Sequence, residues 1–187
     1  INLEAWLGEA LGTRLGRISN TRFTLGSGGA QPRGIITAAA TKSTATNDVF
    51  AADDVLKLIH DVDPAYRSRP GVGFMMHDAI LLTVRLFKDG FGQYLFQPGI
   101  QLGVPDRLLG YPITINQDMA SSVADAAKIL VFGDLASYKV RRVRTMRLRR
   151  LDELYAATDE IGFIAYIRQD GDLLSWGTAP LKVLLVA

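Results

Sequence analysis

Residues 128–151 read KILVFGDLASYKVRRVRTMRLRRL, and this stretch decides the fold. Its first part, Lys128 to Phe132, is a short apolar run that ends at a Gly-Asp turn, as buried strands do. Its second part, Tyr138 to Leu151, is a long strand-like run that carries charge on both faces, so neither face can be a core face. We therefore predict one strand inside a core and one long strand that projects from the body or lies at an interface.

The long strand holds a basic stripe. Seven of the 21 basic residues fall within twelve positions, while the rest of the chain has more acidic than basic residues. Such a stripe faces phosphate, an acidic protein surface or water, and its few aromatic neighbours argue against base-specific reading. Strand alternation would place Arg141, Arg147 and Arg149 on one face and Arg142, Arg144 and Arg150 on the other. The candidates for a subunit-interface or DNA-facing surface are Lys139, Arg141, Arg142, Arg144, Arg147, Arg149 and Arg150.

Upstream of this stretch the pattern is mostly helical. Apolar residues from Leu3 to Leu15 follow one helix face, and we expect this helix to pack against the rest of the protein. The same spacing predicts helices at about 51–62, with Asn47 and Asp48 as capping residues, and at 78–88. Residues 25–34 read as a glycine-rich loop and 35–45 as an extended connector. Further strand-like runs are 94–97, 111–116, 162–168 and 181–186. Helices followed mostly by strands indicate an α+β fold.

The residue types leave little room for catalysis or metal binding. The chain has no cysteine and two histidines, His60 and His77, both at predicted helix ends. The glycine cluster at 26–29 lacks the Lys-Ser/Thr pair of a phosphate-binding loop, so it reads as a surface turn. No motif activates a serine. We predict no catalytic residue, no metal and no cofactor, and we find neither a membrane-spanning run nor a signal peptide.

Six segments, taken in order, carry a family resemblance. They are INLEAWLGEALGTRLGRISNTRF (1–23), GSGGAQPRGI (26–35), FMMHDAILLTVRLFKDGFGQYLFQP (74–98), LLGYPITINQDM (108–119), AKILVFGDLASYKV (127–140) and LRRLDELYAATDEIGFIAYIRQDGDL (148–173). Together they resemble the major capsid (coat) protein of tailed bacteriophages and prophages, which has the Hong Kong ninety-seven phage type of fold. The resemblance spans essentially the whole chain.

The resemblance implies both an architecture and a role. It implies a peripheral lobe, residues 1–46 and 134–172, and an axial lobe, residues 47–133 and 173–187. The role is a non-enzymatic structural subunit of an icosahedral phage or prophage head, which self-assembles into pentamers and hexamers and holds double-stranded DNA non-specifically. Portal and scaffold proteins are further expected partners, and membranes are not. The expected location is the virion, assembled in the bacterial host cytoplasm.

The resemblance also implies that the chain is a C-terminal portion without the family's long N-terminal arm and extended loop, so we expect monomers or small rings of it. Two other readings stay open. An encapsulin-like compartment protein resembles the same fold but encloses enzymes, so its cargo would distinguish it. A small basic nucleic-acid-binding module would use the arginine stripe and would bind in a salt-dependent manner. A hydrolase is a more distant alternative.

Overall fold

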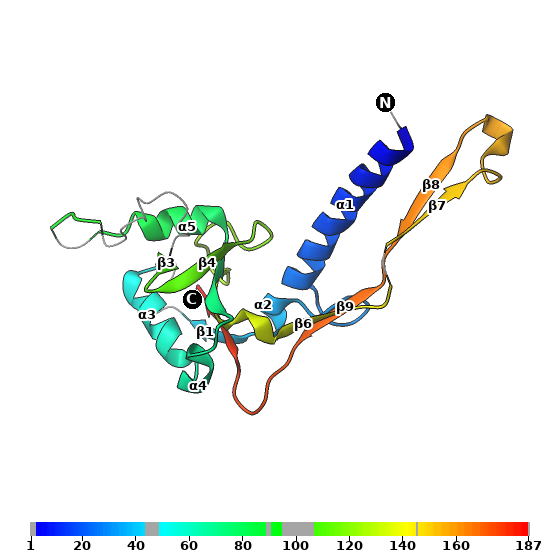
Figure 1. The fold of residues 1–187 in the computed structure, drawn as a ribbon. Coiled ribbons are helices and arrows are strands. Elements are labelled where there is room, and N and C mark those ends of the chain that lie inside the picture. The colour runs from blue at the N-terminus through cyan, green and yellow to red at the C-terminus, as the bar shows by residue number, and fades with distance from the viewer. Residues whose placement is uncertain (1–2, 44–48, 89–90, 95–106, 145, 187) are drawn as a thin grey trace.

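The computed structural model describes residues 3–43, 49–88, 91–94, 107–144 and 146–186 of the 187-residue chain. Figure 1 shows a compact lobe of helices and strands, from which a long helix and a thin two-stranded arm extend. Helices and strands are both abundant, and the strands of the lobe are mostly antiparallel, so the expected α+β class is confirmed.

Two of the helices begin at residues where a side chain pairs with a free backbone N–H. α3 begins after Ala51, whose backbone N–H donates to the Asp54 carboxylate at 3.2 Å, and α5 begins after His77, whose Nδ1 accepts from the backbone N–H of Ala79 at 3.0 Å. Each contact satisfies a backbone donor that the first helical turn leaves unpaired. The helices are α1 (Leu3–Leu25), α2 (Ile35–Ala38), α3 (Ala52–Asp61), α4 (Pro64–Arg67) and α5 (Asp78–Arg85).

A six-stranded sheet forms the centre of the lobe. Its strand order is β1-β10-β5-β2-β4-β3, in which β1 and β10 are parallel, β2 and β4 are parallel, and the other pairs are antiparallel. The strands are β1 (Ala40–Ser43), β2 (Val72–Met76), β3 (Arg107–Leu108), β4 (Tyr111–Ile115), β5 (Lys128–Asp134) and β10 (Leu181–Leu185). The apolar run that starts at Lys128 is therefore the buried central strand that the sequence predicted.

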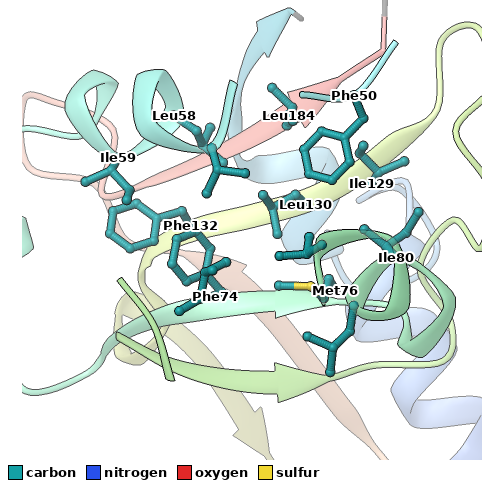
Figure 2. Packing of buried hydrophobic residues seen from close by; sticks show 14 of the residues in the cluster. Phe50, Leu58, Ile59, Phe74, Met76, Ile80, Ile129, Leu130, Phe132 and Leu184 are labelled. Carbon is teal, nitrogen blue, oxygen red and sulfur yellow. The ribbon is translucent and has the colours of Figure 1, made fainter. Parts of the chain in front are cut away.

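The core lies on both faces of this sheet. From β5, Ile129, Leu130 and Phe132 join the larger cluster under α3 and α5, while Val131 joins a smaller cluster beside α2. Figure 2 shows Phe132 against Phe74, and their ring centroids are 4.6 Å apart. The ring of Tyr111 closes the group at 4.9 Å from Phe132. This aromatic packing fixes the sheet on which the extended elements are mounted.

The chain leaves the sheet for the arm at Gly133 and Asp134. Gly133 has φ +138°, and a Cβ atom there would lie 2.2 Å from the carbonyl oxygen of Pro180, so only glycine fits. The buried Asp134 carboxylate accepts hydrogen bonds from Arg69 Nη1 (3.2 Å), Ser137 Oγ (2.8 Å) and the backbone N–H of Ala136 (3.1 Å). These contacts set the direction in which the arm starts.

The arm consists of two short ribbons in series. β6 (Tyr138–Arg142) pairs with β9 (Gln169–Leu173), and β7 (Arg147–Leu151) pairs with β8 (Gly162–Tyr166). The expectation of one strand from 138 to 151 is therefore wrong. The first ribbon ends at the pair Arg142 and Gln169, and the second begins at the pair Arg147 and Tyr166. Between the two ribbons, the backbone N–H of Val143 donates to the carbonyl of Arg168 at 3.1 Å.

α1 is joined to the lobe by polar side chains near its C-terminal end. Asn116 donates to Thr24 Oγ1 at 2.8 Å and accepts from Asn20 Nδ2 at 2.9 Å, while Thr21 donates to Asp118 at 3.1 Å. Asn116 and Thr24 are buried. We call these five residues the polar joint. It holds the last turns of α1 against the loop that follows β4.

Several other expectations differ from the structure. Residues 35–45 contain α2 and β1 instead of a plain connector, α1 runs on to Leu25, and α5 ends at Arg85. Strands β2 and β9 were not predicted. The expected caps Asn47 and Asp48 lie outside the described residues, as do 95–97 of the expected strand 94–97.

Candidate assembly surface

The inner ribbon of the arm combines basic and acidic side chains. Lys139 lies opposite Asp172 and Arg141 opposite Asp170 in the β6–β9 ladder. Opposite charges at facing positions stabilise a strand pair by ~0.2–1 kcal/mol. The sequence pattern did not identify Asp170 and Asp172 as neighbours of the stripe, because only the pairing of two distant segments brings them beside it. The two carboxylates bring negative charge to the face of the ribbon that carries Lys139 and Arg141, and Asp172 also pairs with Arg33 at 3.8 Å.

Tyr138 ties the inner ribbon to the start of the chain. Its hydroxyl donates to the carbonyl of Arg33 at 2.8 Å, and its ring meets Phe23 edge to face with centroids 6.3 Å apart. Burial raises the pKa of Tyr138 to about 12, and the nearby carboxylates of Asp172 and Asp170 add to the shift. The side of β6 that carries Tyr138 therefore faces α1.

A groove remains between α1 and the bend of the arm. It has a volume of about 420 Å³. A Cβ atom added at Gly8 would meet only Leu148, at 4.0 Å, and one added at Gly12 or Gly16 would meet nothing within 4 Å. The packing that we expected along this helix is thus sparse. The groove is lined by Gly12, Leu15, Gly16, Ser19, Asn20, Phe23, Arg142, Met146 and Ile167.

A basic pocket lies at the bend of the arm. Arg144, Arg147 and Arg168 line it together with Val143, Tyr166 and Ile167, around a volume of about 630 Å³. Among the described residues, none of these arginines forms an ion pair. Arg168 was not a candidate from the sequence. It reaches the stripe because the chain folds back on itself, which a linear pattern does not reveal.

The tip of the arm has the opposite charge. Residues 152–161 contain Asp152, Glu153, Asp159 and Glu160 and no basic residue. Arg150 pairs with Asp152 through its Nε. The tip also presents Leu154 and Ile161, which are 68% and 51% exposed. The arm therefore has a basic bend and an acidic, partly apolar tip.

The structure separates the seven stripe residues into different surroundings. All seven are exposed. Arg144 and Arg147 meet in the basic pocket, Arg142 lines the groove, and Lys139 lines a separate pocket of about 300 Å³ beside Trp176. Because β6 ends at Arg142 and β7 begins at Arg147, the expected alternation applies only within each of these strands. The stripe is thus several adjoining surfaces.

The two histidines and the glycine-rich loop, which were considered as possible catalytic or binding groups, lie at helix ends and in a turn. His60 is exposed in the last turn of α3, and His77 caps α5. The glycine-rich loop is closed by a bond from Gly34 N–H to the carbonyl of Gly26 at 2.8 Å. Within the described ranges, no group of acidic and histidine side chains could hold a metal ion. In the same part of the chain, no helix combines the length and apolar character needed to cross a membrane.

Comparison with known proteins gives a consistent set of similarities. Residues 1–183 match the family model described as "Phage capsid family". No curated protein sequence matches. The chain is similar to the capsid of an empty GTA particle computed with C5 symmetry, with 27% identity and a TM-score of 0.86, over 100% of this chain and 67% of that one.

Two further solved structures extend the comparison. The capsid of the native GTA particle has 27% identity and a TM-score of 0.87, and the match covers 100% of this chain and 66% of that one. The structure from Gordonia phage Cozz has 16% identity and a TM-score of 0.70, and the match covers 97% of this chain and 62% of that one. At this identity the likeness concerns the fold alone. The chain therefore spans about two thirds of the length of these capsid chains.

Proposed function

The chain belongs to the phage capsid family, and from this membership we propose that it builds the wall of an icosahedral phage or prophage head. Its copies self-associate into pentamers and hexamers that enclose double-stranded DNA, which they hold non-specifically. Portal and scaffold proteins are partners of the same shell. Assembly takes place in the bacterial host cytoplasm, and the finished protein resides in the virion.

One structural observation supports this proposal: large apolar side chains on α1 and on the arm are exposed to solvent. Trp6 and Ile18 on α1 are 58% and 56% exposed, and the arm adds Val143 and Tyr166. An isolated two-stranded ribbon is at best marginally stable in water. A single copy of the chain cannot cover these surfaces, whereas neighbouring copies around a ring can.

We assign residues 1–46 and 134–172 to a peripheral lobe and residues 47–133 and 173–187 to an axial lobe. The arm and α1 belong to the first, and most of the central sheet belongs to the second. β1 pairs with β10 and so links the two lobes through the sheet. The axial lobe gathers around the five-fold and six-fold axes.

The basic stripe serves contacts between subunits rather than a grip on DNA. Seven phosphate contacts would give a slope of about −6 in log affinity against log salt concentration, which is a strong non-specific binder. A shell wall must let its genome slide during packaging and ejection, whereas contacts between subunits must persist. The charges that face Lys139 and Arg141 already come from protein, at Asp172 and Asp170.

The proposed role is non-catalytic, since no activated nucleophile or general base was identified among the residues weighed above. Expression of the complete protein in bacteria, followed by electron microscopy of the particles and analysis of their contents, tests the proposal. We expect closed shells, and charge reversal at Arg142 and Arg144 should abolish or misdirect their formation even without DNA. Enclosed protein cargo in place of DNA would point to a compartment of the encapsulin kind. Absence of particles would refute the proposal.

A further inference from the structure

The arm carries two surfaces that complement each other in charge. At its bend, Arg144, Arg147 and Arg168 line a pocket of about 630 Å³. At its tip, residues 152–160 carry four carboxylates and no basic residue. Arg150 neutralises part of the charge of Asp152, so Glu153, Asp159 and Glu160 carry most of the remaining negative charge. Opposite potentials on two surfaces favour their association and fix its register.

The two surfaces also complement each other in apolar character. The pocket exposes Val143 and Tyr166, and the tip exposes Leu154 and Ile161, each with about half or more of its area in contact with water. DNA phosphates would satisfy the arginines but would leave these apolar side chains uncovered. A protein surface that brings carboxylates and aliphatic groups together satisfies both requirements.

A tip cannot reach the pocket of its own chain. β8 spans five residues between the two surfaces, and a strand rises ~3.3 Å per residue, so the separation is about 16 Å. The paired strands β7 and β8 prevent the ribbon from folding back within this length. The tip that enters the pocket must therefore come from another molecule.

We propose that the basic pocket at the bend of one arm binds the acidic tip of the arm of a second copy. This inference rests on the proposed shell function. It names the arm tip of a second copy as the partner of Arg144 and Arg147, two residues of the basic stripe. Because each arm bears both halves of the contact, every copy both gives and receives it. The same contact then repeats from copy to copy, as a symmetric assembly requires.

Residues 1–187 contain no cysteine, so disulfide trapping gives a direct test once any cysteine elsewhere in the complete protein is replaced by serine. One version of the complete protein carries Val143→Cys in the pocket, and a second, of different size, carries Leu154→Cys at the tip. These changes keep all charges. A disulfide needs Cα atoms about 4.4–6.8 Å apart, so a covalent product of mixed size after co-expression and oxidation reports a tip in a pocket. A tip version paired with Arg107→Cys, on the compact lobe, measures random collisions.

Charge reversal makes the test specific. Adding Arg144→Glu and Arg147→Glu to the pocket version should reduce the mixed product about tenfold, and adding Glu153→Lys and Glu160→Lys to the tip version should restore it. Reversal of Arg14 and Arg17 on α1 is the matched control and should leave the yield unchanged. Circular dichroism confirms that the exposed substitutions leave the fold intact.

The outcomes separate this inference from the proposed function. Shells by electron microscopy together with a mixed product at the collision level overturn the inference and leave the shell function standing. The same holds if pocket reversal removes binding of a short DNA duplex but leaves the mixed product unchanged. Failure of the unaltered protein to form particles refutes the shell function itself. A mixed product above the collision level that follows the charge reversals supports the proposal.

Discussion

The Asn116→Ala substitution should loosen α1 from the sheet. Asn116 makes three hydrogen bonds in the polar joint: to Thr24 Oγ1 (2.8 Å), from Asn20 Nδ2 (2.9 Å) and from the backbone N–H of Asp118 (3.1 Å). Water can replace the bonds to the more exposed Asn20 and Asp118, at a net loss of ~0.5 kcal/mol each. It cannot reach Thr24, which is 2% exposed, so an unpaired hydroxyl there costs ~1–3 kcal/mol. The expected total is about 2–4 kcal/mol.

Urea unfolding of the wild-type and variant chains measures this loss, and hydrogen exchange shows where it acts. Amides of residues 19–25 should exchange faster in the variant, while those of β5 should follow the global stability alone. The double variant with Thr24→Val should cost less than the sum of the two single variants, because it removes both partners of the buried bond. Asn20→Ala, at the exposed side of the joint, is the control and should cost under ~1 kcal/mol. A cost of less than ~1 kcal/mol for Asn116→Ala, or strict additivity in the double variant, would refute this account of the joint.

Three other predictions concern single side chains. Replacing His77 with alanine should lower stability by ~1 kcal/mol through the lost cap, whereas His77→Asn should keep it and both should still assemble; a hydrolytic activity that disappears with either change would contradict the structural role. Because the folded state holds the Tyr138 proton up to about pH 12 and the unfolded state releases it near 10, this residue's contribution to stability is complete below pH 10 and lost between 10 and 12. Unfolding experiments across that range should show the loss in the wild type and not in Tyr138→Phe. Phe132→Ala should destabilise the sheet by ~3–5 kcal/mol in thermal or urea unfolding, since the ring is fully buried against Phe74 and Tyr111, and a cost below ~2 kcal/mol would contradict that packing.

The elements that local pattern predicted are those whose burial is visible in the sequence. α3, β4, β5 and β10 each show a regular apolar period or an apolar run between turn residues. β2 was overlooked because its sequence, VGFMM, is apolar throughout and runs directly into a helix, so it has no alternation. β9 reads QDGDL, which is poor in strand-forming residues. Its conformation depends on β6, which lies about thirty residues away in the chain.

The candidate surface was also predictable only where it depends on a local sequence pattern. The stripe itself is a local feature, and the sequence alone located all of its members. The pocket that Arg144 and Arg147 form with Arg168 depends on which residues face one another after the chain reverses at the tip of the arm. The bend between β6 and β7 also depends on the partner strands, because the pairing with β9 ends at Arg142 and the pairing with β8 begins at Arg147. Tertiary pairing, which no local period encodes, thus determined the part that was missed.

The position of the polar joint near one end of α1 makes the helix a lever. Its 23 residues extend over about 34 Å, so a rotation of about 5° at the joint displaces the far end by about 3 Å. In a closed shell every subunit repeats the same angular error, and the errors accumulate around each ring. The hydrogen bonds between α1 and the loop after β4, together with the contact of Phe23 with Tyr138, therefore limit the angle of the helix, and we expect them to limit the range of curvature that a wall of such subunits can accept.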